Sequence, residues 1–153
     1  MSILDELGHV TTLHIDSTSV PWVQDGGARY KLLQARESDN LVVTHFRTAP
    51  GTASGIHRHL APALLYTIEG TWSHRPEIMD YSPGTYVCEP VGALHRYIGG
   101  PDWVEAIEFS FSDNENFNAE GEMISRTTLK DKVERYFMLC EEQGLPRPNI
   151  LTE

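Results

Sequence analysis

The sequence has little cysteine and little positive charge. Its two cysteines, Cys88 and Cys140, are too few for a disulfide scaffold, so we expect reduced thiols, with Cys88 in the core. Lys and Arg number 12 against 22 Asp and Glu, which gives a formal net charge of -10, and the basic residues are scattered. A partner with many negative charges would be repelled, so nucleic acid is excluded as a partner.

Long hydrophobic runs are also missing. No apolar run approaches the roughly 20 residues that a bilayer span requires. The first residues, Met1–Glu6, lack the basic start and apolar core of a signal peptide. We therefore expect a cytoplasmic protein without a membrane partner, and 153 residues is the length of a single domain.

Short strands separated by turn signals are what the chain does contain. They recur over residues 28–112, and eight or more of them indicate an all-β sandwich or barrel. Residues 1–27 are poorly patterned and are expected to form an N-terminal arm, with a helical turn at Leu4–Leu7 and an edge strand at Val10–Ile15. The predicted barrel is therefore preceded by an arm that carries no evident chemistry.

Residues 113–153 are expected to lie outside the barrel. They begin with a polar connection, and Thr128 with Asp131 then forms a capping box ahead of residues that are apolar at helical spacing. Gly144 and Pro146 end that pattern. This predicts a C-terminal amphipathic helix followed by an extended tail.

Three histidines form the strongest chemical pattern. His57 and His59 are separated by one residue, so on a β-strand both imidazoles leave the same face and reach one metal ion. His95 follows a Pro90-x-Gly92 turn that can bring a third imidazole from a neighbouring strand. Three neutral nitrogen ligands suit Fe, Mn, Ni, Cu or Zn better than Ca or Mg. The intervening Arg58 and its counterpart Arg96 are expected to face the other way.

These residues resemble the two cupin motifs. The first has Gly51, five residues, His-x-His and then Gly70; the second has Gly84, five residues, Pro-x-Gly, two residues and His95. The Glu that usually follows His-x-His after three or four residues is absent, because Ala63 and Leu64 stand there, and Gly99 replaces the Asn that usually ends the second motif.

Loss of that Glu is typical of the three-histidine cupin dioxygenases. The runs His-Arg-His, Gly-Thr-Trp72 and Tyr86-Val-Cys-Glu89-Pro-x-Gly are similar to those of the 2,4'-dihydroxyacetophenone dioxygenases. The resemblance implies a single-domain jelly-roll β-barrel. It also implies Fe(II), with Zn, Ni or Mn able to replace it in a purified sample.

The implied reaction uses O2 to cleave the C–C bond next to the carbonyl of a small enolisable ketone or hydroxyketone, giving two carboxylic acids. A metal held by three neutral imidazoles keeps its full charge and open positions, so it favours a deprotonated chelating substrate.

Other polar residues complete the predicted site. Glu77 is either a fourth metal ligand or a solvated turn residue; Glu69 and Glu89 are alternatives, and Glu89 could hydrogen-bond a ligand histidine. Tyr97 shares strand parity with His95 and is expected on the pocket wall as a catalytic residue. An aromatic or otherwise apolar substrate is indicated by the aromatic residues expected around it: Tyr66, Trp72, Tyr97, Phe109 and Phe111.

Two other functions remain open. One is a non-catalytic cupin that binds a metal or small molecule as a sensor, and the other is a metal-dependent isomerase with His45 or His74 as its base. Exposed edge strands near the N-terminus and the amphipathic helix also predict a homodimer.

Overall fold

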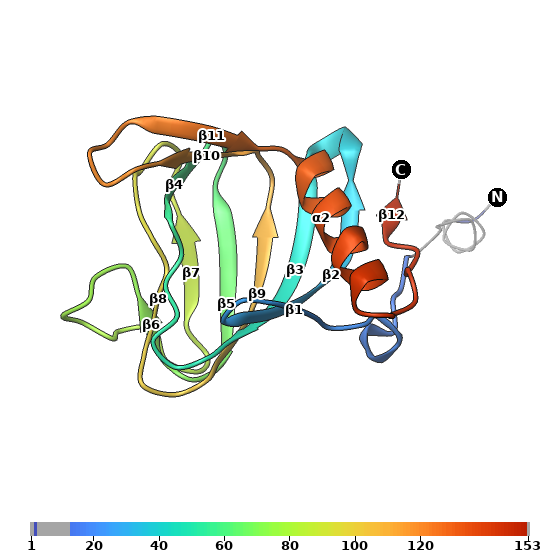
Figure 1. Ribbon diagram of the computed structural model, residues 1–153, viewed down its shortest axis with the longest axis horizontal. Helices are drawn as coiled ribbons and strands as arrows, with labels where there is room; N and C mark the ends of the chain where they lie inside the picture. Colours follow the sequence, from blue (N-terminus) through green and yellow to red (C-terminus); the bar gives the residue numbers. More distant parts are fainter. Residues whose placement is uncertain (1, 3–12, 153) are drawn as a thin grey trace.

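The computed structural model describes residues 2 and 13–152. The turn predicted at Leu4–Leu7 lies outside them, as does the first half of the strand predicted at Val10–Ile15, and residues 13–15 form no strand. The described chain is a β-structure closed at one end by a helix (Figure 1), which confirms the predicted fold class.

A seven-stranded sheet is the largest sheet of the described residues. Its strand order is β1-β2-β3-β9-β5-β7, with β12 also pairing with β2. Neighbours on the main path are antiparallel, and β12 runs parallel to β2. The strands are β1 Val23–Asp25, β2 Ala28–Arg36, β3 Leu41–Thr48, β5 Ala63–Glu69, β7 Tyr86–Glu89, β9 Val104–Ser110 and β12 Leu151–Thr152.

Two smaller sheets complete the β-structure of the described residues. One has the order β11-β10-β4 and the other pairs β6 with β8. Their strands are β4 Ile56–His59, β6 Trp72–Ser73, β8 Ile98–Gly99, β10 Asn114–Phe117 and β11 Met123–Thr127. The sequence predicted a polar connection at β10 and β11, but these residues form a hairpin across the molecule that pairs with β4 (Figure 1).

The helix α2, Leu129–Glu142, packs against β1 and β2 at the right of Figure 1. It begins at the predicted capping box, because Thr128 Oγ1 accepts from the Asp131 N–H while the Asp131 carboxylate accepts from the Thr128 N–H. Two short 3-10 helices, η1 Ser17–Ser19 and η2 Glu37–Asp39, complete the described elements. Among the described residues there is no helix with the length and apolar character of a membrane span.

Alternation along the large sheet separates an inner from an outer face. On β5, Ala63, Leu65 and Thr67 are buried inside, whereas Tyr66 is half exposed outside. Phe109 on β9 and Cys88 on β7 also lie outside, so the expectation that Cys88 is a core thiol is wrong. The inner face of β5, β7 and β9 therefore presents its side chains to the histidine-bearing strand β4.

Candidate metal centre

Strand β4 and the residue opposite it bring three imidazoles together. His57 and His59 share the inner face of β4, and a bridge pairs His57 with His95. In this bridge the His57 N–H donates to the His95 carbonyl over 2.9 Å and the His95 N–H donates back over 3.0 Å. The two sequence motifs thus meet in one antiparallel pair.

The three rings face a common point. His57 lies 5.1 Å from His59 and 4.6 Å from His95 between ring centroids, and His59 lies 5.1 Å from His95. One nitrogen of each ring lies within 4.8 Å of a nitrogen of the others. This spacing fits three ligands of a single metal ion, as their positions in the sequence predicted.

Backbone and amide oxygens orient two of the rings. His57 Nδ1 donates to the Gly55 carbonyl over 2.9 Å, and His59 Nδ1 donates to Asn114 Oδ1 over 3.0 Å. With Nδ1 carrying the proton, Nε2 keeps its lone pair. The Nε2 atoms of His59 and His95 are buried and have a carboxylate, that of Glu89, beside them but no well-aligned hydrogen bond among the described residues, and a bound metal would supply a partner for both.

The pKa values of His57 and His59 are shifted in opposite directions. Burial lowers the pKa of His57 to about 4, so this ring is neutral and ready to act as a ligand at neutral pH. Burial also acts to lower the pKa of His59, but the Glu89 and Glu108 carboxylates outweigh it and the net shift is upward. A metal ion would therefore have to displace a proton more often at His59 than at His57.

Glu89 lies directly beside these nitrogens. It is buried on the inner face of β7, and its nearest contacts are His74 Nε2 at 2.6 Å, His95 Nε2 at 2.9 Å and His59 Nε2 at 3.3 Å. Burial alone would raise the pKa of Glu89, but the surrounding imidazoles lower it further than burial raises it. Glu89 is thus a carboxylate at the candidate metal centre, as one of the sequence alternatives allowed.

A second acidic side chain and a lysine lie behind the centre. Glu108 on β9 has a carboxylate oxygen within 4.8 Å of ligand atoms of His59 and Glu89. Burial raises the pKa of Glu108 and lowers that of Lys132, which reaches in from α2. Lys132 Nζ donates to Ser110 Oγ over 3.3 Å and lies 3.5 Å from Asn114 Oδ1, so the helix is linked to the group that orients His59.

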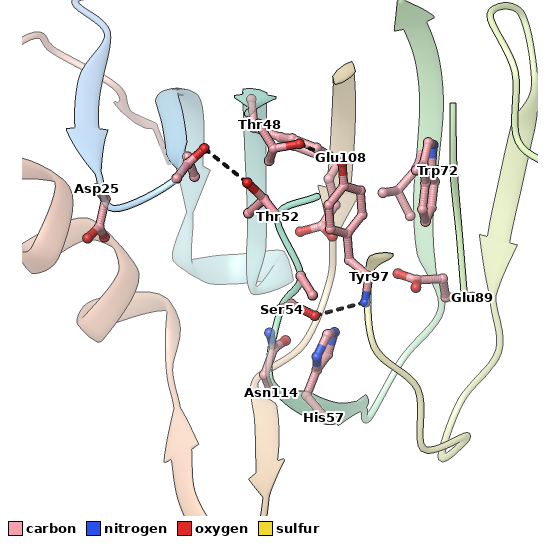
Figure 2. A pocket seen from close by; sticks show the side chains of 15 residues that line it. Asp25, Thr48, Thr52, Ser54, His57, Trp72, Glu89, Tyr97, Glu108 and Asn114 are labelled. Atoms are coloured by element: carbon pink, nitrogen blue, oxygen red, sulfur yellow. Dashed lines mark hydrogen bonds between the residues drawn. The ribbon is translucent and has the colours of Figure 1, made fainter. Parts of the chain in front are cut away.

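A cavity of about 420 Å³ opens in front of His57. Its apolar wall includes Phe46, Leu65 and Trp72, and the Tyr97 ring packs on both Phe46 and Trp72. The Tyr97 hydroxyl shares a 2.6 Å hydrogen bond with Thr48 Oγ1, and burial raises the pKa of Tyr97 to about 12. Figure 2 shows the polar and aromatic side chains that line this space, namely Thr48, Thr52, Ser54, His57, Trp72, Glu89, Tyr97, Glu108 and Asn114.

Several predicted site residues lie elsewhere. Glu77 is exposed in the turn after β6, where Arg75 and Ile78 form a bridge, and the structure does not bring it to the histidines. Glu69 is exposed at the end of β5. His45 lies on the outer face and pairs with Glu105 over 2.9 Å, which removes it as an inward base.

The aromatic residues expected around the pocket divide between two faces. Trp72 and Tyr97 line the cavity, but Tyr66, Phe109 and Phe111 border a separate apolar hollow on the outside of the large sheet.

Arg58 points away from the centre, as predicted, and its Nε donates to Glu115 Oε1 over 2.9 Å. Strand parity alone does not tell which face is inner, because that depends on which strands become neighbours in the sheet.

Asn114, Glu108 and Lys132 were missed in the sequence. Asn114 lies in a stretch rich in Asp, Asn and Glu, which are poor strand formers, and only its pairing with His59 in the β4–β10 register reveals its role. The alternation of Glu108 with Phe109 on β9 was the one signal that could have placed this carboxylate inside.

Comparisons with known proteins agree with this architecture. Residues 10–111 match the family described as the ChrR cupin-like domain. A cupin-like protein of unknown function from Ralstonia eutropha JMP134 has a TM-score of 0.84 at 22% identity, covering 95% of each chain. An RmlC-like cupin from the same organism has a TM-score of 0.81 at 17% identity, covering 95% of this chain and 98% of that one.

An enzyme is also among the similar structures. The acetylacetone dioxygenase of Acinetobacter johnsonii has a TM-score of 0.71 at 17% identity, covering 85% of this chain and 93% of that one. A search of curated proteins finds no match to this chain.

Proposed function

The chain belongs to the family of ChrR cupin-like domains, and from this premise we propose that it is an Fe(II)-dependent dioxygenase acting on a small enolisable ketone or hydroxyketone. The observation that carries this proposal is the set of His57, His59 and His95, whose inward nitrogens meet beside an open, partly aromatic cavity. The acetylacetone dioxygenase of similar fold supports this choice of chemistry. Its substrate is a diketone that forms an enolate.

We assign His57, His59 and His95 as the metal ligands. Fe(II) bound there would supply a Lewis-acidic site with positions open to a chelating substrate and to O2. Because all three ligands are neutral, a dipositive ion bound there keeps a net positive charge even beside the Glu89 carboxylate, and the site favours a substrate that brings its own negative charge, as an enolate does. Glu77 is not included, since its side chain is exposed in a turn.

The remaining cavity residues bind and shield the substrate. The rings of Phe46, Trp72 and Tyr97 provide an apolar wall that suits an aryl group and excludes water. The Tyr97 hydroxyl, held by Thr48, is placed to orient a polar group at the far end of the substrate. Tyr97 therefore acts in binding and orientation.

A metal-binding sensor is the second candidate, and it is compatible with the family match, whose description names a cupin-like domain and no catalytic activity. The isomerase interpretation is weaker: His45 faces outward, and the hydrogen bonds of His74 go to Tyr81 and Glu89.

Oxygen incorporation separates catalysis from binding. Protein loaded with Fe(II) without air is mixed with 2-hydroxyacetophenone and ¹⁸O2, and the products are analysed by mass spectrometry. Insertion of O2 across the bond between the carbonyl and hydroxymethyl carbons converts the ketone to benzoic acid and formic acid, so each acid should carry one ¹⁸O atom.

His95→Ala should abolish both products, whereas Arg96→Ala, a neighbour exposed to solvent, should not. If no aryl ketone or diketone is consumed while iron stays bound, the sensor interpretation replaces the enzyme.

A further inference from the structure

The carboxylate missing from the first motif is replaced across a strand pair. Ala63 occupies one of the two positions where a metal-binding Glu usually stands, and in the β5–β7 register its partner is Glu89. Partners in an antiparallel pair project from the same face. Glu89 therefore delivers a carboxylate to the space that the shortened Ala63 side chain leaves open, and this space adjoins the histidine nitrogens.

The hydrogen bond of Glu89 goes to a residue outside the three-histidine set. Glu89 Oε2 accepts from His74 Nε2 over 2.6 Å. The Nε2 atoms of His95 and His59 lie 2.9 and 3.3 Å from the carboxylate, so the contact with His74 is the shortest of its three contacts with imidazole nitrogens. The carboxylate is thus adjacent to the metal-facing nitrogens but is tied to His74.

His74 is itself fixed on its other side. The Tyr81 hydroxyl and His74 Nδ1 share a hydrogen bond of 3.0 Å, and burial raises the pKa of Tyr81, so the hydroxyl keeps its proton. Backbone hydrogen bonds in both directions join Tyr81 to Trp72, whose ring contacts His74 at 5.4 Å between centroids. Because a carboxylate can only accept, His74 Nε2 donates to Glu89, and in the neutral ring Nδ1 then accepts from the Tyr81 hydroxyl, so one tautomer satisfies both contacts.

We propose that His74 is a positioning residue that holds Glu89 outside the metal's coordination shell. The inference rests on the metal site of the proposed function. A carboxylate this close to a divalent ion is attracted to an open coordination position of that ion. Because Glu89 is buried, little water solvates its carboxylate and weakens this attraction. The short bond to His74 supplies the competing interaction and keeps that position open for a chelating substrate.

Cobalt spectroscopy tests this without turnover. Wild-type protein and His74→Phe are loaded with Co(II), metal content is measured, and acetylacetone is titrated while the visible spectrum is recorded. The Phe ring keeps the contacts with Trp72 and Tyr81 but donates no hydrogen bond. We expect one cobalt per chain in both proteins, an altered spectrum in His74→Phe, and diketone binding about 10- to 100-fold weaker because Glu89 must be displaced.

A second substitution separates positioning from general damage. Glu89→Gln introduced into His74→Phe removes the anionic ligand, so diketone affinity should return towards the wild-type value. His74→Gln, which keeps an N–H donor, should stay close to wild type. Arg75→Ala, at the next, exposed position, serves as the matched control.

The outcomes are distinct. An unchanged cobalt spectrum and diketone affinity in His74→Phe, or no recovery in the double variant, would overturn the role of His74 alone. Wild-type protein that binds no cobalt would overturn the metal site as well. If His74→Phe does not fold, Tyr81→Phe, which removes only the hydroxyl that orients His74, should shift the spectrum and affinity in the same direction to a smaller extent, and no shift would count against the proposal.

Discussion

Orientation of a single imidazole shows how this site depends on residues far apart in the chain. His59 is nearly inaccessible to solvent, and its Nδ1 proton is held by Asn114 Oδ1. This bond selects the tautomer in which Nε2 faces the centre. The amide of Asn114 also lies within reach of Lys132, which connects the candidate metal centre to the C-terminal helix.

Asn114→Ala should therefore weaken metal binding by about 10- to 100-fold while the three histidines remain. Competition with a chromophoric chelator measures the affinity. Asn116→Ala is the matched control, because Asn116 lies on the same strand but donates to Ser125 and Thr127 of β11. Equal affinities of Asn114→Ala and wild type would show that the amide does not orient His59.

The sequence predicted the three histidines because their spacing depends only on strand alternation and one turn. It left Glu89 among three acidic alternatives, because choosing it required the inner face of β7 to be known. Asn114 was not predicted at all, since it reaches His59 through a strand pairing that no local pattern encodes. Residues placed by local geometry were predictable, and residues placed by long-range register were not.

Among the elements, α2 was predictable for the same reason. Its capping box and its apolar spacing are both local, and the observed helix begins and ends where they indicate. The hairpin of β10 and β11 was not predicted, because its sequence is polar and its stability comes from pairing with β4. Helix α2 is anchored by Tyr136, which is fully buried and donates from its hydroxyl to the Pro21 carbonyl over 2.7 Å.

Tyr136→Phe should lower the free energy of unfolding by about 1 kcal/mol, since it removes this hydrogen bond and leaves the Pro21 carbonyl unpaired. Urea unfolding followed by circular dichroism measures the change. Tyr86→Phe, which alters a tyrosine that is 61% exposed, should have no measurable effect. A midpoint for Tyr136→Phe equal to that of wild type would contradict the anchoring role.

Alkaline pH should destabilise the same region. Burial raises the pKa of Tyr30 to about 12 and also raises that of Tyr136, whereas tyrosines of the unfolded chain ionise near pH 10. The stabilising contribution is therefore complete below pH 10 and is lost as pH rises through the folded-state value. Urea unfolding between pH 9 and 12 should show stability falling above pH 10, with a shallower fall in Tyr30→Phe; identical slopes would contradict the assignment.

At the scale of the whole molecule, one part of the outer face of the large sheet, around the hollow between β5, β7 and β9, is lined by uncharged side chains. Tyr66 on β5 pairs with Tyr86 on β7, and Leu64 pairs with both Cys88 and Phe109. Tyr66, Tyr86, Phe109 and Phe111 are 49, 61, 39 and 37% exposed, which leaves on the order of 400 Å² of aromatic surface uncovered. That is about half of what each partner buries in a standard interface, so it can form the apolar centre of one.

The homodimer predicted from the sequence is therefore expected to form through this face, because an uncharged patch is complementary to its own copy about a two-fold axis. Sedimentation equilibrium should give a dimer for wild type and a monomer for Tyr86→Lys. Met138→Lys, on the exposed side of α2, should remain dimeric. A monomer at high micromolar concentration would contradict the dimer, and loss of the dimer only in Met138→Lys would transfer the interface to the helix.

The central claim is that His57, His59 and His95 hold a metal ion, and metal content tests it most directly. Protein purified without air is analysed by mass spectrometry for Fe, Mn, Ni, Cu and Zn, as wild type and as the three single His→Ala variants, with Glu77→Gln as control. We predict one iron per chain in wild type and Glu77→Gln, and loss of the metal in each His→Ala variant while circular dichroism shows an intact fold. Full metal occupancy in all three His→Ala variants would contradict the claim.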